Sequence, residues 1–526
     1  MKVLHAFAFA TLLTAAAFAQ PRISRVQNNY SYILPGMPNY GIAQGSIFDI
    51  FGSGLATATS QLQGVPLPRS LNGASVDITV SGTTTQAILY FVSAAQIAAI
   101  LPSATPTGTG QITVTVSGQK SAPAAITVIQ SAFGLLSLNG VGNGPAAVFD
   151  LSSNYLGITN AANPGDFITL WGSGLGPVTG DETQTQTPAT LAGTIPIEVD
   201  IGGTIATIQY AGRSIYPGLD QINVQVPPGP TGCHISVVVR TGDIVSNFGS
   251  IPVATSGRTC SEPFIGLTAG KLQSLLSQPA ITRGVIDFVN STSGSSADVT
   301  FGRFTNAQYA TKEPIGFTSM YDCVVYNYTN TNMAIPNPIK PAFLNAGPSI
   351  NITTPNGSAS MPFQDGGYSV DNLPMGSSLK GAYTYTGTGG PDIGAFTAQV
   401  TWPGGGGGFT SSTPGNPTSV ARSKGLTVTW SQPSNTDPAE YIQIGGYAFV
   451  PNAANGAEFA CSVPLSAGRF TVPPAVLLAL PPQVGLATPQ ATLEVDLFIT
   501  QQFTAPGADY GLINFLLQTI GPFSYQ

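Results

Sequence analysis

The histidines limit the chemistry that this chain could perform. Only His5 and His234 occur among the 526 residues. His5 lies in an N-terminal segment that we expect to be removed, so a Ser-His-Asp triad would have to use His234. No G-x-S-x-G sequence is present to supply the exposed serine of an α/β-hydrolase. A metal site with several histidines is therefore excluded, and we expect His234, beside Cys233 at the start of a predicted strand, to be structural or at the surface.

Carboxylates offer a second kind of chemistry, because a pair of Asp or Glu side chains can hydrolyse glycosidic bonds without histidine. Most acidic residues stand at turns or caps, where Asp bonds nearby backbone amides, and no calcium-loop spacing occurs. A carboxylate-dependent glycoside hydrolase with its site in the C-terminal half is therefore an alternative function. The residues available for such a pair are Asp166, Asp181, Glu182, Asp298, Asp365, Asp371, Asp392, Asp437 and Glu440.

Aromatic side chains offer a binding surface, because the C–H face of a sugar ring stacks on a flat apolar ring. Trp171 and Trp430 lie in predicted strands and are expected in the core. Trp402, next to a run of glycines, is the tryptophan that we expect to be exposed. Tyr383 and Tyr385 share one face of a predicted strand. Trp402, Tyr383 and Tyr385 are therefore the candidate stacking residues.

The four cysteines, an even number, suggest disulfides in an exported chain. Three pairings are open, and we favour Cys233–Cys260 with Cys323–Cys461, because each pair then stays within one presumed module. A metal site is the rival interpretation, but close CxxC spacing is lacking. We expect no cofactor and no metal ion.

The N-terminus has the layout of a secretory signal peptide. Lys2 and His5 precede an apolar run that closes with Ala17-Phe18-Ala19, so residues 1–19 are expected to be removed and the mature chain to begin near Gln20. No later segment predicts membrane insertion. We therefore expect a secreted or cell-surface protein.

Composition indicates many short strands. Only 8% of the residues are charged and 42% are hydrophobic, while glycine and proline number 62 and 43. Weak charge with frequent turn formers is typical of an all-β protein with enough apolar surface for a core. The net charge of -7 and the lack of any Lys/Arg cluster argue against nucleic acid and against anionic membranes.

An internal duplication is the most informative feature. QGSIFDIFGSGLA at 44–56 parallels PGDFITLWGSGLG at 164–176, and QIAAILP at 96–102 parallels QINVQVP at 221–227. Strands such as ITVTV at 112–116 alternate with period two, as in a sheet with one buried face. The Gly-Ser-Gly element could be a phosphate loop, but neither copy is followed by a helix with a lysine. We interpret it as a bend at a strand end, where glycine permits positive φ.

These motifs carry a resemblance to a known family. PGDFITLWGSGLGP, IPIEVDIGGTIATIQYAG, PGLDQINVQVP and VSNFGSIPV resemble the Solibacter-type C-terminal domain of acidobacterial exported proteins, a relative of IPT/TIG domains. The match covers about 140–256, with a looser IPT/TIG-like copy at 40–130. The resemblance implies immunoglobulin-like β-sandwiches and export, and it implies no activity.

The domain organisation follows from these patterns. Residues 268–277 predict a short amphipathic helix, and strand patterns return after 285. The Gly/Pro/Ser/Thr-rich stretch 403–418 is a linker or a long loop, and we favour the loop. The expected order is a signal peptide (1–19), an N-terminal segment (20–39), an IPT/TIG-like sandwich (40–130), a Solibacter-type sandwich (131–257), a junction with a short helix (258–280), a β-rich domain (281–402), the stretch 403–418 and a β-sandwich region (419–526).

The poverty of catalytic groups favours a non-enzymatic function. We expect tandem immunoglobulin-like modules with a structural, adhesive or ligand-binding function, whose partner is a protein or a polysaccharide. The glycoside hydrolase remains the alternative.

Overall fold

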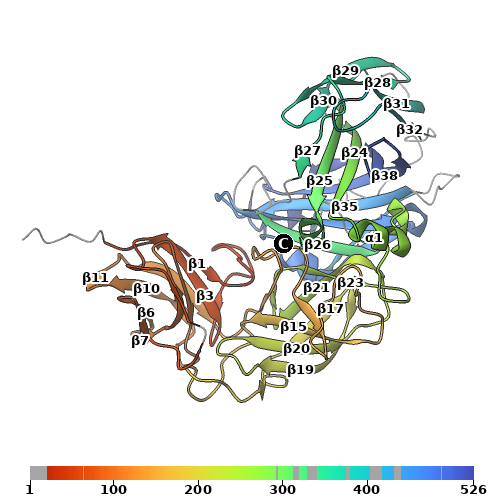
Figure 1. Cartoon of the computed structure of the whole chain (residues 1–526). Coiled ribbons are helices and arrows are strands. Elements are labelled where there is room, and N and C mark those ends of the chain that lie inside the picture. Colours follow the sequence, from red (N-terminus) through yellow and green to blue (C-terminus); the bar gives the residue numbers. More distant parts are fainter. Residues whose placement is uncertain are drawn as a thin grey trace, which may run out of the picture.

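The computed structural model contains two β-sandwiches and a larger β-rich C-terminal unit (Figure 1). It describes residues 20–62, 64–291, 294–311, 319–328, 341–374, 379–402, 418–431, 440–486 and 488–526. The expected signal peptide and nearly all of the stretch 403–418 lie outside these residues. Within them, no helix is long and apolar enough to cross a membrane. The all-β immunoglobulin-like fold class is confirmed.

The first sandwich packs two sheets around one apolar core, to which the alternating strand β6 contributes Val76, Ile78 and Val80. One sheet contains, in spatial order, β1 (Arg22–Asn28), β3 (Ile47–Ser53), β9 (Gln96–Ile100), β8 (Ile88–Val92) and β4 (Ser60–Gln61). The other contains β2 (Ile42–Ala43), β12 (Ala124–Ile129), β10 (Gly108–Val116), β6 (Ala74–Val80) and β5 (Ser70–Leu71), with β11 (Gln119–Lys120) and β7 (Thr83–Gln86) beside it.

The second sandwich repeats this plan, with its own core. Its first sheet contains β13 (Gly134–Leu135), β15 (Phe167–Ser173), β20 (Asp220–Gln225), β19 (Thr207–Arg213) and β16 (Ala189–Thr190), with β14 (Val148–Asp150) against β15. Its second contains β18 (Thr204–Ile205), β17 (Ile197–Ile201), β21 (Gly232–Thr241) and β22 (Ile244–Val245), with β23 (Gly249–Val253) against β21. The central pair β3–β9 of the first sandwich corresponds to β15–β20 here, as the duplication predicts.

The C-terminal unit is organised around one large sheet. Its path contains β26 (Asp322–Tyr328), β36 (Gly456–Pro464), β35 (Glu440–Phe449), β38 (Thr492–Phe503), β39 (Tyr510–Leu517), β24 (Ala280–Ser291), β25 (Gly294–Thr305), β30 (Gly367–Asp371), β29 (Gly357–Gln364), β28 (Ser349–Thr354), β31 (Gly381–Gly387) and β32 (Phe396–Trp402). Shorter strands complete the unit, namely β27 (Ala342–Phe343), β40 (Ile520–Pro522), β33 (Ser419–Val420) with β41 (Ser524–Tyr525), and β34 (Leu426–Thr429) with β37 (Arg469–Val472).

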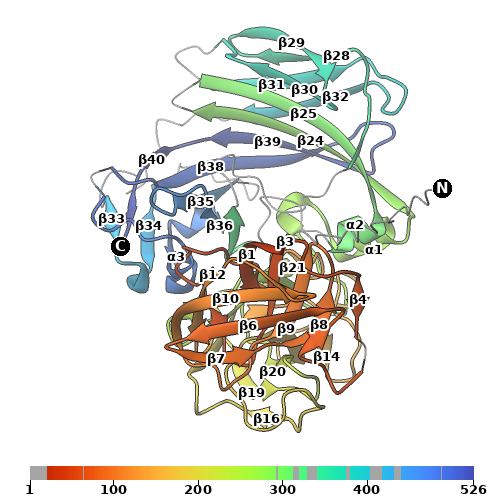
Figure 2. The same ribbon diagram turned by 90° about the vertical axis from the view of Figure 1, so that its left-hand side faces the viewer.

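This sheet curls over itself, so that β28 to β32 form a layer above β24, β39 and β38 (Figure 2). We expected two separate regions at 281–402 and 419–526. Both contribute strands to this sheet and side chains to one core. They form one unit because β24 pairs in parallel with β39, more than 200 residues later in the chain.

Helices are few and short. They are η1 (Pro263–Ile265), α1 (Ala269–Leu276), α2 (Asn306–Thr311), η2 (Arg422–Lys424), η3 (Leu465–Ala467) and α3 (Pro474–Leu478). Helix α1 is the amphipathic helix expected at 268–277. The side chain of Thr268 caps it by accepting a hydrogen bond from Lys271 N at 3.2 Å, and Leu272 and Leu275 are buried beneath it.

The three units are fastened to one another by buried polar contacts. Ser173 Oγ accepts from Ile47 N of the first sandwich at 2.8 Å and donates to Gly218 O at 2.6 Å. Between the second sandwich and the C-terminal unit, Ser236 Oγ donates to Asp322 Oδ1 at 2.6 Å. These bonds satisfy groups that would otherwise be buried without partners, so the modules are held in a defined arrangement.

Candidate functional site

A groove of about 550 Å³ lies on the outer face of the second sandwich. Strands β15 and β20 form its floor, and the turns after β14 and β19 form its walls. Its volume falls within the range of small-molecule and oligomer sites. The lining residues are Phe149, Asp150, Leu151, Ser153, Thr169, Trp171, Pro188, Ser214, Ile215, Tyr216, Gln221 and Asn223.

The floor combines an indole ring with amide side chains. In the β15–β20 register, Trp171 lies opposite Gln221 and Thr169 opposite Asn223, so the four share one face. Asn223 Oδ1 accepts hydrogen bonds from Thr169 Oγ1 at 3.1 Å and from Gln221 Nε2 at 2.8 Å. These two bonds occupy the carbonyl end of the Asn223 amide and leave its Nδ2 donors available to a ligand.

The first wall is the turn at 150–154. Asp150 Oδ1 accepts from the backbone N–H groups of Ser152 and Asn154, both at 2.8 Å, and its Oδ2 accepts from Asn154 Nδ2 at 2.8 Å. These bonds to Asn154 and Ser152 lower the pKa of Asp150. The turn holds Leu151 outward, with 54% of its surface exposed. An apolar side chain is therefore exposed to solvent at the rim of the groove.

The second wall is the loop between β19 and β20, where Ile215 and Tyr216 are 49% and 56% exposed. Tyr216 N donates to Ser214 Oγ at 3.1 Å, which shapes the turn. Gly218 follows with φ +71°, a left-handed conformation that favours glycine, and it packs against Ile47 of the first sandwich. The exposed pair is therefore presented by a loop whose base is fixed.

A buried ion pair fixes the strands beside this loop. Arg213 Nε donates to Asp220 Oδ1 at 2.7 Å, and the two side chains are 1% and 0% exposed. Asp220 Oδ2 also accepts from Gly174 N and Leu175 N at 2.7 and 2.8 Å. The aspartate thus joins the Gly-Ser-Gly bend to the ends of β19 and β20. These contacts lie within the protein, so this wall of the groove is preorganised for binding.

The matching face of the first sandwich carries different groups. Phe51, the counterpart of Trp171, is covered by the guanidinium of Arg25 at 4.8 Å from its ring centroid. Ala98 stands where the second copy has Asn223. Asp49, the counterpart of Thr169, is buried and accepts from Asn29 Nδ2 and Gln96 Nε2, and burial raises its pKa to about 6. The first copy therefore lacks the combination of an aromatic ring with the amide of Asn223 that lines the groove of the second copy.

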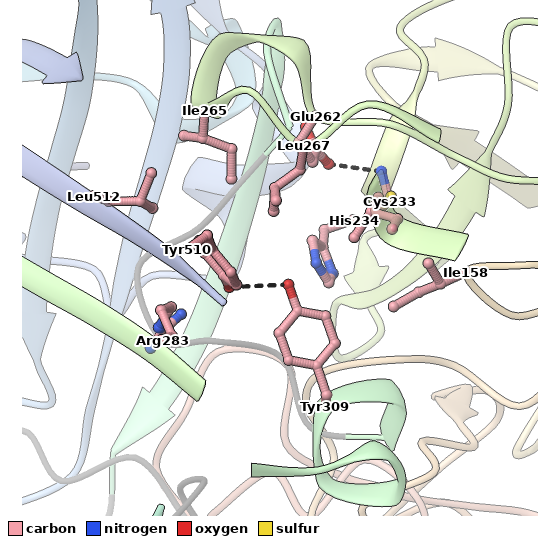
Figure 3. A pocket seen from close by; sticks show the side chains of 11 residues that line it. Ile158, Cys233, His234, Glu262, Ile265, Leu267, Arg283, Tyr309, Tyr510 and Leu512 are labelled. Atoms are coloured by element: carbon pink, nitrogen blue, oxygen red, sulfur yellow. Dashed lines mark hydrogen bonds between the residues drawn. The ribbon is translucent and has the colours of Figure 1, made fainter. Parts of the chain in front are cut away.

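His234 lies at a different place, in the junction between the second sandwich and the C-terminal unit (Figure 3). The cavity beside it measures about 20 Å³, which holds about one water molecule. Glu262 Oε1 accepts there from Cys233 N and from Ser319 Oγ, both at 2.6 Å, while Tyr309 and Tyr510 contact through their hydroxyls at 3.2 Å. The cavity is too small for a substrate, so we interpret this cluster as a structural contact between the two units.

The cysteines pair as predicted. Disulfides join Cys233 to Cys260 and Cys323 to Cys461, across 27 and 138 residues of chain. The first fastens the end of the second sandwich to the segment before α1. The second lies within the large sheet, where Cys323 of β26 is directly opposite Cys461 of β36.

The aromatic residues chosen from the sequence do not form an exposed stacking surface, and this expectation was wrong. Trp402 is 2% exposed and stacks on Phe515 at 4.4 Å, and Tyr383 and Tyr385 are fully buried. The cause is the curl of the large sheet, which turns the inner face of β31 and β32 onto β24 and β39. Trp430 is buried, as expected.

Trp171 was also assigned wrongly, because its match to Phe51 suggested the core. In β15, Phe167, Thr169 and Trp171 lie on the face opposite to buried Ile168 and Leu170. A signal was present in the sequence: Trp171 shares its strand face with Thr169, and the paired strand places Gln221 and Asn223 there.

Within the described residues, Asp298 and Asp371 are the candidate carboxylates that lie near one another, and the others are held in separate places. Asp166 pairs with Arg258, Asp181 accepts from Thr183, and Glu182 accepts from Ser103 N and Oγ at 2.8 Å. Asp298 and Asp371 lie on adjacent strands β25 and β30, where burial and the charge of Asp371 raise the pKa of Asp298. Asp365 occupies a left-handed turn position, Asp392 accepts from Asn345 N, Glu440 begins β35, and Asp437 lies outside the described residues.

The fold defines a multi-module protein of immunoglobulin-like sandwiches. Residues 37–128 form an IPT/TIG domain, which coincides with the first sandwich that the duplication marks at 40–130. No curated protein matches the chain.

Solved structures give weaker similarity. The plexin A4 extracellular region is 12% identical over 47% of this chain and 20% of its own, with a TM-score of 0.18. The Bacteroides ovatus protein SGBP-B, solved with a mixed-linkage heptasaccharide, is 10% identical over 83% and 94% of the two chains, at a TM-score of 0.13. The surface layer protein SbsC, domains 4–9, is 10% identical over 95% and 66%, at 0.13. Such scores carry no argument about function.

Proposed function

We propose that this chain is an exported, non-enzymatic binding protein that holds its ligand in the groove of the second sandwich. The carrying observation is that Leu151, Ile215 and Tyr216 are about half exposed around a concave floor that contains Trp171. Exposed apolar side chains gathered at a concavity are typical of an interaction site. The IPT/TIG domain and the C-terminal unit act as supports that fix the direction of the groove.

Export to an oxidising compartment is part of the proposal. Two disulfides account for all four cysteines, and such bonds persist mainly outside the cytosol. The signal-peptide pattern at 1–19 supports the same conclusion. We also assign residues 131–257 to the Solibacter-type C-terminal domain, on the motifs between 164 and 253.

The proposal that the protein is not an enzyme is supported by the hydrogen bonds that two buried carboxylates make within the protein. The carboxylate of Glu262 is committed to Cys233 N and Ser319 Oγ. Asp322, which lines a crevice of about 150 Å³ with Asp200, accepts from Ser236 Oγ and Cys323 N at 2.6 and 2.7 Å. Groups held in this way support structure, and we assign them no part in bond cleavage.

The experiment uses the full chain expressed with its own N-terminus. N-terminal sequencing of the medium or envelope fraction should find Gln20 first. The purified protein and its Trp171→Ala variant are then compared for binding to a glycan array and to cell-surface protein extracts. Phe343→Ala is the control, because Phe343 is an exposed aromatic residue (53%) of the C-terminal unit that does not line the groove.

Binding that Trp171→Ala removes and Phe343→Ala preserves is the expected result. Release of reducing sugar from any bound polysaccharide would instead support the glycoside hydrolase and would overturn the non-enzymatic function. A protein retained in the cytosol with four free thiols would overturn export.

A further inference from the structure

We infer that the ligand of the groove is an uncharged polysaccharide, lying across β15 and β20 between the turns at 150–154 and 214–219. This inference rests on the proposed binding function and adds the chemical class of the ligand. It depends on three features of the groove. An aromatic ring and amide side chains share its floor, no Lys or Arg lines it, and it lies on the face of a sheet and not at an edge.

The floor has the two kinds of group that a sugar requires. A pyranose presents an apolar C–H face, which packs on an aromatic ring, and a rim of hydroxyls that both donate and accept. Trp171 supplies the ring, while Asn223 Nδ2 and Gln221 Oε1 supply a donor and an acceptor on the same face. Because Asn223 Oδ1 is held by Thr169 and Gln221, the amides are oriented before binding, which lowers the entropic cost of association.

The charge of the groove disfavours anionic ligands. None of the residues that line it is Lys or Arg. Its single acid, Asp150, has both oxygens engaged by Ser152 and Asn154 within the turn. An anionic polymer would meet this carboxylate and the net charge of -7 without a cation in the groove lining, and the positive charge that acts on Asp150, that of Arg258, lies outside that lining. An uncharged ligand meets no such repulsion.

The position of the groove also disfavours an extended peptide. A peptide is commonly bound by adding a strand to the edge of a sheet, where free backbone groups pair with it. Here β15 lies between β13, β14 and β20, and β20 lies between β15 and β19. Both floor strands are interior, so a peptide would cover a face that offers it side chains alone, whereas sugar hydroxyls bond well to amide side chains and water.

A neighbouring pocket indicates that the ligand is a chain of sugars. Tyr216 lines both the groove and a second pocket of about 320 Å³ where the two sandwiches meet. Tyr30, Tyr90 and Val65 of the first sandwich complete that pocket, and its lining is mainly apolar. A polymer can pass Tyr216 and occupy both, which a monosaccharide cannot do.

The test is affinity electrophoresis in native gels that contain soluble xyloglucan, galactomannan or hydroxyethyl cellulose. The net charge of -7 carries the protein toward the anode, and retention by the polymer measures binding. Gels with alginate and polygalacturonate are the anionic counterparts. Retention by at least one uncharged polymer is expected, with no retention by the anionic ones and little change between low and high salt.

Two variants examine the floor. Trp171→Ala removes the ring and should weaken binding at least about tenfold. Asn223→Asp keeps the oxygen that accepts from Thr169 and Gln221 but replaces the amide donor, and it should weaken binding about tenfold without loss of folding. Phe343→Ala should bind as the native protein does, and circular dichroism confirms that all variants fold.

The outcomes separate the inference from the proposed function. If the native protein binds no uncharged polymer but captures a surface protein in a Trp171-dependent way, the polysaccharide inference fails and the binding function stands. If an uncharged polymer is bound equally by Trp171→Ala and Asn223→Asp, the groove is not its site and the inference fails. If the polymer is bound and cleaved, the non-enzymatic function fails.

Discussion

Acidification is expected to stabilise the contact between the second sandwich and the C-terminal unit. Asp322, at the start of β26, is 2% exposed, and its carboxylate accepts from Ser236 and from Cys323 N. The pKa of Asp322 is raised from 3.8 to about 7, mainly by burial and in smaller part by the charge of the nearby Asp200, against the lowering effect of its hydrogen bonds. The carboxyl group in the folded protein therefore holds its proton at a pH where the unfolded chain has lost it.

The direction and the size of the change in the free energy of unfolding follow from the linkage between protonation and folding. Between about pH 4 and pH 7 the folded state binds more protons than the unfolded state, so the free energy of unfolding rises as the pH falls through this window and levels off below it. A difference of about 3 pKa units corresponds to about 4 kcal/mol. For a unit of about 150–250 residues, this change corresponds to a rise of about 8–16 °C in the melting temperature between neutral and mildly acidic pH.

The assay is urea unfolding of the native protein and of Asp322→Asn at several pH values across the window. The amide keeps the shape of the side chain but does not titrate, so the variant should lose the contribution of Asp322 to the pH dependence. Asp49 and Glu458, whose pKa values burial raises to about 6 and about 7, titrate in both proteins and cancel in the difference. Equal pH dependence in the two proteins, or a native protein that is destabilised by mild acid, would refute this reasoning.

Three further predictions, on the disulfides, the buried ion pair and Gly218, are tested by urea unfolding. Replacing Cys323 and Cys461 together by serine should cost about 5 kcal/mol, because the disulfide closes a loop of 138 residues, against about 3.5 kcal/mol for the 27-residue loop at the junction; equal losses would contradict the loop-entropy explanation. Arg213→Met should cost about 3–5 kcal/mol, because it leaves the Asp220 carboxylate buried without its cation; a neutral effect would show that the pair does not fix the groove wall. Gly218→Ala should cost about 1–3 kcal/mol, since its Cβ would lie 2.6 Å from a side chain of the first sandwich, and unchanged stability would indicate that the two sandwiches separate easily.

Local patterns in the sequence predicted the sandwiches well, because a strand with one buried face records that face in every second residue. The alternation of Ile112, Val114 and Val116 appears directly as buried side chains of β10. The duplication located the first sandwich at 40–130, in agreement with the IPT/TIG domain at 37–128. The cysteine pairing followed from the assumption that each bond stays within a module.

The C-terminal unit was less predictable, because its pairings are distant in sequence. Nothing local to Val285 or Leu512 indicates that β24 and β39 lie side by side in parallel. Nor does a strand pattern reveal that the sheet will curl, and it is the curl that buries Trp402 against Phe515. The period of two shows that a strand has two different faces, but only the tertiary arrangement determines whether the second face meets water or another layer.

The contrast between the two sandwiches shows which residues distinguish the copy that carries the groove. Both copies place an aromatic residue at the same point of the same strand, Phe51 or Trp171. In the first copy β1 runs along β3 and brings Arg25 over Phe51, whereas in the second copy β15 pairs with the short β13 and β14, and Trp171 is partly exposed in the groove. In the first copy, Arg25 contacts Phe51 and buried Asp49 is hydrogen-bonded, so these residues stabilise the sandwich itself. In the second copy, Trp171 and Asn223 line the groove. This division supports the proposal that the first copy is a supporting domain and the second a binding domain.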